Sequence, residues 1–365
     1  VQESRPDAAT AVAALVELAR DRGWPVLADI ASGLRQHAAL APALVHGFDL
    51  FLRSETARAA LRPELVLHVG RMPTSKTLFT WLQQLEDDDV DVVHLSTDGQ
   101  AHSLGHSPQV VTTTWPQLRA SCSAASPTLR SGEDWLRRWQ EAQRVTRSAT
   151  DHAAKDAGLW EGAVARVASR MPAGSSLVLG SGMPIRDADA YVTGLAPDTR
   201  CLVNRGVNGI DGLLATAAGV ATHAADRPVR LLIGDQAFLH DVGSLAVVAG
   251  RPNLDIVVIN NGGSGIFEFL PISQAGEAFD KYFLAPQHAD IPSVAAAFGV
   301  AACRCNSIEG LEELLETPQQ GPRIVEVVVD RAHNVYIHKQ ISAAVIDRLE
   351  QEPHTETTDG KRADA

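Results

Sequence analysis

VRLLIGD (residues 229–235) and DIVVINNGG (residues 255–263) are two short apolar runs, and each ends in polar residues and glycine. Uninterrupted apolar runs of this length are typical of strands that are buried on both faces of a parallel sheet. In such a sheet, ligands bind in the crevice beyond the carboxyl ends of the strands. We therefore expect Asp235 and Asn261 to lie in one place, although they are far apart along the chain.

Both halves of the chain repeat this pattern of apolar runs. Helix-length segments separate further runs at 176–180, 201–203 and 323–329 in the second half, and at 24–28, 65–69 and 90–95 in the first half. Alternation of short strands with helices is typical of parallel sheets that are covered on both faces. The sequence therefore predicts an α/β fold with two doubly wound parallel-sheet domains.

The composition changes once, near the end of the first third of the chain. The stretch SCSAASPT, residues 121–128, is rich in Ser, Ala and Pro and indicates a linker, and an amphipathic helical stretch follows it. We therefore divide the chain into a first α/β domain at 1–120, a linker with its leading helix at 121–158, a second α/β domain at 159–349 and a frayed tail at 350–365.

The charge of the chain limits its partners. Thirty-two Lys and Arg residues against 44 Asp and Glu residues give a net charge of -12 over 365 residues. This excess of negative charge argues against a nucleic-acid-binding surface and against binding to an anionic membrane. An anionic ligand must then meet a local cluster of cations. No apolar run reaches the roughly 18 residues of a membrane span, and the first residues show no signal-peptide pattern, so we expect a cytoplasmic protein.

The two strand ends also suggest a metal site. The carboxylate of Asp235, the amide oxygen of Asn261 and the backbone carbonyl of Gly263 are hard oxygen donors, which suit Mg²⁺ and also Mn²⁺. The glycines of the second loop allow the backbone to come close to a ligand. The alternative is that both motifs are ordinary turns. His102 and His106 are spaced like ligands on a helix, but their Ser- and Gly-containing segment disfavours a helix, so we expect no zinc site there.

These motifs resemble those of a known superfamily. The residues Gly234-Asp235-Gln236, followed by a pair of asparagines after 23 intervening residues, resemble the thiamine-diphosphate and Mg²⁺ signature of thiamine-dependent enzymes. More of the sequence is similar to the MenD family, the 2-succinyl-5-enolpyruvyl-6-hydroxy-3-cyclohexene-1-carboxylate synthases of menaquinone biosynthesis. The segments that carry this resemblance are GSGMPIRDAD (180–189), VNRGVNGIDGLLATAAGVA (203–221), GDQAFLHDVGSL (234–245), INNGGSGIFEFLP (259–271) and, more weakly, GWPVLADIASGLR (23–35) and GRMPTSKTL (70–78).

The resemblance implies a carboligase that decarboxylates 2-oxoglutarate and adds the succinyl unit to isochorismate. Residues 159–349 would then be the thiamine-diphosphate-binding domain and residues 1–120 the middle domain. The resemblance assigns the metal to Asp235, Asn261 and Gly263, and it assigns the cofactor to the same three residues together with Gly234, Gln236 and Ile266.

The resemblance also implies which residues meet the substrates. Arg186 and Arg205 would face the substrate carboxylates, with Lys76 nearby, and guanidinium groups are well matched to carboxylates. Apolar residues would exclude water from the reacting groups. Those that match the family are Ile210, Ile266, Phe267 and Leu270.

Enzymes of this class have three domains. The first part of this sequence resembles their middle domain. The pyrimidine-binding domain carries the glutamate that activates the cofactor, and neither Glu3 nor Glu17 has the strand-and-turn context that such a glutamate needs. We therefore expect a pyrimidine-binding domain in the same or another chain, a homo-oligomer, and little activity from this chain alone. Two alternatives stay open: a non-catalytic binding or regulatory relative, and another 2-oxo-acid thiamine enzyme of the acetolactate synthase or decarboxylase type.

Overall fold

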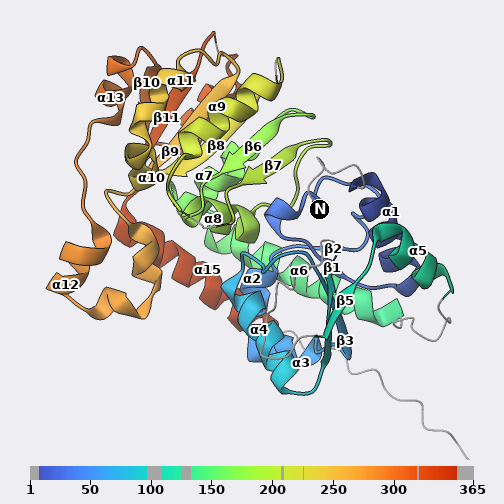
Figure 1. Cartoon of the computed structure of the whole chain (residues 1–365). Helices are drawn as coiled ribbons and strands as arrows, with labels where there is room; N and C mark the ends of the chain where they lie inside the picture. Colours follow the sequence, from blue (N-terminus) through green and yellow to red (C-terminus); the bar gives the residue numbers. More distant parts are fainter. Residues whose placement is uncertain are drawn as a thin grey trace, which may run out of the picture.

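The structure of the protein is a computed structural model that describes residues 8–96, 109–124, 133–206, 209–224, 226–318 and 320–351 (Figure 1). Every strand pairing within these residues is parallel. The strands form a six-stranded sheet in the order β10-β11-β9-β8-β6-β7, a three-stranded sheet in the order β3-β4-β5 and a separate pair, β1-β2. The predicted α/β fold with parallel sheets is therefore confirmed. The two histidines considered for a zinc site, His102 and His106, lie outside the described residues.

The six-stranded sheet has helices on both faces. Its strands are β6 (Ser176–Leu179), β7 (Arg200–Val203), β8 (Val229–Gly234), β9 (Leu254–Asn260), β10 (Ala301–Cys305) and β11 (Arg323–Val328). Successive side chains along β8 and β9 point to opposite faces, so each strand contributes to two apolar cores. One core includes α9 (Leu213–Ala224), α10 (Asp235–His240), α11 (Leu245–Val248) and α13 (Ile291–Ala297), and the other includes α7 (Glu161–Ala168), α8 (Met183–Tyr191) and α14 (Ile308–Glu316).

The strand order predicts a ligand site beyond the carboxyl ends of the strands of this sheet. The chain passes from β6 outward to β7 and then returns to β8 on the other side of β6, so the direction of winding reverses between β6 and β8. Open α/β sheets bind ligands beyond the strand ends at such a reversal. Gly234 lies opposite Ile259 in the β8–β9 register, so the residues that follow both strands emerge side by side.

The first unit is smaller. Its strands are β1 (Val26–Leu27), β2 (Leu44–Val45), β3 (Leu65–Val69), β4 (Asp91–Ser96) and β5 (Gln109–Thr112). Its helices are α1 (Ala8–Arg22), α2 (Phe48–Phe51), α3 (Glu55–Ala60), α4 (Lys76–Asp87) and α5 (Trp115–Ala124). Ser54 and Ser75 cap α3 and α4 with side-chain oxygens that accept a backbone N–H three residues on, as helix starts commonly require.

Two long helices complete the core of the first unit. The leading helix predicted from the sequence is α6 (Glu133–Ala153), and it packs against α15 (Arg331–Gln351). Figure 1 shows α15 running from the six-stranded sheet toward α2 and α4. One apolar cluster joins these elements, and among its members are Phe48, Phe51, Trp81, Leu85, Trp139, Val145, Ile337, Ile341 and Val345.

The two units also share a buried ion pair. Arg35, from the first unit, and Asp189, from α8, are almost completely buried and lie 2.5 Å apart. Asp189 accepts a second hydrogen bond from the backbone N–H of Ile30, and Arg35 donates to the carbonyl of Val192. Breaking one partner of such a buried pair is strongly destabilising, so this contact fixes the first unit against α8. Within the described residues, no helix is long and apolar enough to cross a membrane.

Candidate functional site

Asp235 begins α10, directly beyond the carboxyl end of β8, and its side chain is buried. Its Oδ2 accepts a hydrogen bond of 2.9 Å from the backbone N–H of Gly263 and one of 2.8 Å from Nε2 of Gln287. Its Oδ1 accepts from the backbone N–H of Gln236 at 2.8 Å. Burial raises the pKa of Asp235, and these three hydrogen bonds oppose that shift. A positive ligand would therefore be favourable beside this carboxylate.

Two asparagines follow β9. Asn260 accepts hydrogen bonds from Gln287 at 2.9 Å and from the backbone of Gly262 at 3.0 Å, and it donates to Glu326 at 2.7 Å. Asn261 instead donates through Nδ2 to Glu161, at 2.8 Å. The Oδ1 atom of Asn261 is buried and has no hydrogen-bond partner among the described residues. Buried acceptors without a partner are rare in folded proteins, and a bound ion can satisfy such an atom.

The loop after Asn261 has room only for glycine at its closest approaches. A Cβ atom at Gly263 would lie 2.5 Å from the carbonyl oxygen of Leu284, and its φ of 152° disfavours other residues. A Cβ atom at Gly265 would lie 2.5 Å from Nδ2 of Asn261. These glycines therefore let the loop fold back beside Asp235 and Asn261.

The residues present fit a hard divalent cation. The described residues contain no group of three or more His, Cys, Asp or Glu side chains that could hold a metal. The predicted donor set is of another kind, with one carboxylate, one amide oxygen and one backbone carbonyl, and Mg²⁺ takes the rest of its shell from water and phosphate. The carboxylate of Asp235 and the unpartnered amide oxygen of Asn261 match that set.

A buried polar layer lies beneath Asn261. Glu161 is 1% exposed, and burial, followed by the nearby charge of Asp187, raises its pKa to about 7. Asp187 accepts a hydrogen bond of 2.9 Å from Nε2 of His338. The side chain of Asn334 accepts from the backbone N–H of Glu161 at 3.0 Å. Helices α7, α8 and α15 therefore meet in one polar layer that leads to a predicted metal ligand.

The predicted arginines lie close together. Nη1 of Arg186 donates to the carbonyls of Ser181, at 2.8 Å, and Gly182, at 2.6 Å. Burial and then the neighbouring charge of Arg205 lower the pKa of Arg186. Nη1 of Arg205 is buried without a hydrogen-bond partner among the described residues. Two partly buried guanidinium groups, one of them unsatisfied, form a site that favours an anion.

The other predicted site residues differ in how much of their side chains is exposed to solvent. Lys76 is exposed in the first turn of α4, and no hydrogen bond or ion pair of the described residues involves it. The side chains of Ile210 and Leu270 are 40% and 38% exposed. Phe267 lies in a 3₁₀ turn, η4 (Gly265–Phe269), and packs edge to face on Phe283 with ring centroids 5.9 Å apart.

Three further residues belong to the predicted cofactor set. Gln236 donates through Nε2 to the carbonyl of Ala285 at 2.6 Å, and Ile266 is half-buried in η4. Gly234 ends β8 and precedes Asp235. The hydrogen bond from Gln236 ties the start of α10 to the loop that carries Leu284, the neighbour of Gly263.

Sequence reasoning did not find Gln287 or Glu161. Gln287 lies in a loop without a recognisable pattern, yet its single Nε2 bridges the ends of β8 and β9. Glu161 is the first residue of α7. Acidic residues are common at this position because they interact favourably with the helix dipole, so a glutamate there does not by itself indicate a site. Neither position carries a signal in the sequence that separates it from ordinary loop or helix residues.

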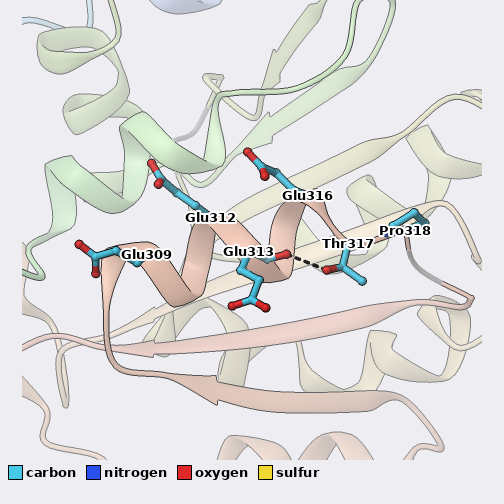
Figure 2. Close-up of a pocket in the computed structure, with 6 residues that line it drawn as sticks. All are labelled: Glu309, Glu312, Glu313, Glu316, Thr317 and Pro318. Atoms are coloured by element: carbon cyan, nitrogen blue, oxygen red, sulfur yellow. Dashed lines mark hydrogen bonds between the residues drawn. The ribbon is translucent and has the colours of Figure 1, made fainter.

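A surface hollow on α14 lies away from these residues. Figure 2 shows Glu309, Glu312, Glu313 and Glu316 spreading their carboxylates outward from α14. Glu312 pairs with Arg170, and Glu316 immediately precedes the turn toward the amino end of β11. The hollow runs along α14, and none of its lining residues belongs to the predicted site.

Two family models match successive parts of the chain. The family model described as "Thiamine pyrophosphate enzyme, C-terminal TPP binding domain" matches residues 183–327, which include the ends of β8 and β9. The family model described as "Middle domain of thiamine pyrophosphate" matches residues 7–178. Together the two models account for most of the chain.

Curated relatives are similar over most of this chain. Proteins named 2-succinyl-5-enolpyruvyl-6-hydroxy-3-cyclohexene-1-carboxylate synthase are 34% identical in Synechococcus elongatus, 33% in Listeria monocytogenes and 38% in Sorangium cellulosum. The matches cover 90%, 92% and 90% of this chain, and 56%, 58% and 55% of the relatives, respectively. The chain thus spans a little over half the length of these relatives.

Proposed function

Because the chain belongs to the thiamine pyrophosphate enzymes, we propose that it is the middle and cofactor-binding part of a 2-succinyl-5-enolpyruvyl-6-hydroxy-3-cyclohexene-1-carboxylate synthase. Such a carboligase decarboxylates 2-oxoglutarate and adds the resulting succinyl unit to isochorismate. The observation that carries the proposal is that two buried groups follow the neighbouring strands β8 and β9: the carboxylate of Asp235, and Oδ1 of Asn261, which has no hydrogen-bond partner among the described residues.

The metal and the cofactor diphosphate would be held at this edge. Asp235, Asn261 and the carbonyl of Gly263 would bind Mg²⁺, and the diphosphate would bind beside the glycine loop. When bound, thiamine diphosphate supplies the carbon nucleophile and the electron sink for decarboxylation of a 2-oxo acid. The residues of this chain would position the cofactor and neutralise the charges of its diphosphate and of the substrates, as the protein commonly does in a cofactor enzyme.

Arg186 and Arg205 would bind the substrate carboxylates. Two carbonyls fix Nη1 of Arg186, so its position is set before any ligand arrives. Nη1 of Arg205 lacks a partner among the described residues, so a carboxylate would satisfy it. Binding groups that are held in place in advance lose little conformational entropy when the substrate binds. This arrangement suits 2-oxoglutarate and isochorismate, which are both dianionic.

Apolar side chains near the loop would exclude water. Ile210 and Leu270 are large apolar residues that remain partly exposed, and Phe267 lies in the same loop as Leu270. Reacting groups in a site without water interact more strongly with fixed charges. We further propose that a pyrimidine-binding domain, in this chain's full-length protein or in another subunit of a homo-oligomer, covers these residues and supplies the activating glutamate.

Asp235→Ala tests the cofactor site. The change should weaken Mg²⁺-dependent binding of thiamine diphosphate by about 100-fold or more, because it removes the one charged metal ligand. Isothermal titration calorimetry with and without Mg²⁺ measures this effect, and circular dichroism checks that the fold is retained. Glu309→Ala, an exposed acid on α14 that is not among the predicted site residues, is the control and should bind like the parent chain. Equal affinities in the parent and Asp235→Ala chains would refute the site.

A second experiment tests the substrate. The chain is supplied with the pyrimidine-binding domain, and release of CO₂ from 2-oxoglutarate is compared with release from pyruvate. A preference for 2-oxoglutarate, and consumption of isochorismate, are the expected results. A preference for pyruvate would instead assign the protein to the acetolactate synthase or decarboxylase type. Binding of the cofactor without any CO₂ release would indicate a non-catalytic relative.

A further inference from the structure

Glu161 is a buried acid whose side chain contacts the amide of Asn261. It begins α7 and is 1% exposed, and its Oε1 lies 2.8 Å from Nδ2 of Asn261. No residue role that the family resemblance implies includes it. The position of Glu161 beneath a predicted metal ligand, and not in contact with a predicted substrate residue, suggests a role that is exerted through Asn261.

The hydrogen-bonding rules of the two groups fix the orientation of the amide. An ionised carboxylate can only accept hydrogen bonds, whereas an amide has a donating and an accepting end. In the structure, Oε1 of Glu161 accepts a hydrogen bond from the NH₂ end of Asn261, so the amide oxygen points away from Glu161. The oxygen, Oδ1, must point the other way, where it is buried without a partner among the described residues. A cation bound beside Asp235 would satisfy this oxygen.

Glu161 is itself held firmly. Its backbone N–H donates to the side chain of Asn334 on α15 at 3.0 Å. Trp160, which precedes it, is 1% exposed and packs edge to face on Tyr191 with centroids 4.8 Å apart. A Cβ atom at Gly162, which follows it, would lie 2.2 Å from the ring of Trp160. The start of α7 therefore has little freedom to shift when a ligand binds.

We propose that Glu161 is a positioning residue of the metal site, which holds the amide of Asn261 so that Oδ1 faces the cation. The inference rests on the proposed function, because it presumes that Asn261 is a metal ligand. Residues that orient metal ligands in this way commonly change metal affinity by about 10- to 100-fold when they are replaced.

The principal test is Glu161→Gln. Glutamine has the same shape but can either accept from or donate to Asn261, so it no longer excludes the flipped amide. We expect the affinity for Mn²⁺, measured by electron paramagnetic resonance in the presence of thiamine diphosphate, to fall about 10-fold or more. Asp187→Asn is the matched control. It removes another buried carboxylate of the same layer that bonds His338 and not Asn261, and it should leave the affinity within about threefold of the parent.

A second variant distinguishes positioning from a structural role. In Glu161→Gln/Asn261→Asp the donor and acceptor are exchanged, because the introduced glutamine would donate to one oxygen of the introduced carboxylate and leave the other for the metal. Because Asn261→Asp also adds a negative charge at the metal, its effect is compared in both backgrounds. The change should favour Mn²⁺ binding more in the Glu161→Gln background than in the parent, where the new carboxylate would face Glu161. An equal effect of Asn261→Asp in both backgrounds would overturn the positioning role.

The outcomes separate the inference from the proposed function. Loss of Mn²⁺ binding in Asn261→Ala, together with parent-like binding in Glu161→Gln, would overturn the role of Glu161 and leave the metal site intact. Weakening by Asp187→Asn as large as that by Glu161→Gln would overturn it as well. Parent-like binding in Asn261→Ala, or no binding by the parent chain, would overturn the metal site and the positioning role together. Thermal melting of each variant shows whether it is folded.

Discussion

Arg205 has a buried guanidinium nitrogen without a partner among the described residues, and it lies beside the positive charge of Arg186. Such an arrangement is unfavourable in the free protein and becomes favourable when an anion binds. A bound dianionic substrate would offset the repulsion between the two guanidinium groups. The structural position of Arg205 and the family resemblance lead to the same expectation.

Arg205→Ala should raise the KM for 2-oxoglutarate by about 10- to 100-fold, because a hydrogen bond to a charged group contributes about 1.5–3 kcal/mol. The Kd for thiamine diphosphate should stay unchanged, and the melting temperature should not fall, since a repulsion is removed. Steady-state kinetics with the added pyrimidine-binding domain and calorimetry measure the two constants. Arg137→Ala, an exposed arginine on α6, is the control. If KM and Kd rose together, Arg205 would hold the cofactor.

At this scale the sequence predicted a site at the ends of two strands, and it did not predict which other residues hydrogen-bond to the side chains there. Asp235 and Asn261 follow strands that any apolar-run analysis finds, and parallel topology brings them together. Gln287 and Glu161 reach the same place from a loop and a helix start whose positions depend on tertiary packing. Local sequence carries no information on such contacts, so the positioning residues could be found only in three dimensions.

Helix α7 shows how tightly one element is fitted at the site. Its neighbours leave no space at Gly162, where a Cβ atom would lie 2.2 Å from Trp160 and 2.7 Å from Tyr191. In contrast, a Cβ atom at Gly219, in the exposed face of α9, would meet nothing within 4 Å. The same substitution at the two helices should therefore have opposite effects.

Gly162→Ala should reduce the free energy of unfolding by about 1–3 kcal/mol, because overpacking displaces a buried indole ring. Gly219→Ala should increase it by about 0.5–1 kcal/mol, since alanine loses less backbone entropy in a helix interior. Urea unfolding followed by circular dichroism measures both changes. Stabilisation by Gly162→Ala would show that Trp160 and Tyr191 can move apart easily.

The strands differ in how well the sequence predicted them. The apolar runs at 65–69, 176–180 and 323–329 became β3, β6 and β11 with ends shifted by no more than one residue. The sequence did not predict β2 (Leu44–Val45), β5 (Gln109–Thr112) or β10 (Ala301–Cys305). These strands are short or lie at a sheet edge, where one side needs no apolar pattern. These segments form strands because they pair with a neighbouring strand, and not because their own residues favour a strand.

At the scale of the whole molecule, His338 and Asp187 connect α15 to α8 through a buried hydrogen bond of 2.9 Å. Burial alone lowers the pKa of His338, but the hydrogen bond and charge of Asp187, the carbonyl of Asn334 and the charge of Glu161 together raise it above its usual value. A raised pKa in the folded state means that this pair stabilises the fold fully below the unfolded pKa of about 6.5. The contribution is lost as the pH rises through the folded pKa.

Asp187→Asn should therefore destabilise the protein more at pH 6 than at pH 9. At pH 6 it replaces a charged hydrogen bond, and a loss of roughly 1.5–3 kcal/mol is expected. As the pH rises through the folded pKa, the imidazole of the parent loses its charge, so the difference from the parent should shrink. Urea unfolding at the two pH values tests this, with Asp134→Asn, an exposed acid on α6, as the control. A loss of the same size at both pH values would show that the charge of His338 in the folded protein does not change between them.

Helix α15 ends the described chain, yet it fills the core of the first unit together with Phe48, Phe51 and Trp81. During synthesis, the ribosome releases these three residues long before it releases Ile341 and Val345. At about 5–20 residues per second, the apolar face of the first unit must wait for tens of seconds until its last partner emerges. The nascent chain therefore exposes this face to chaperones, and a ribosome that stalls before α15 would release a product prone to aggregation.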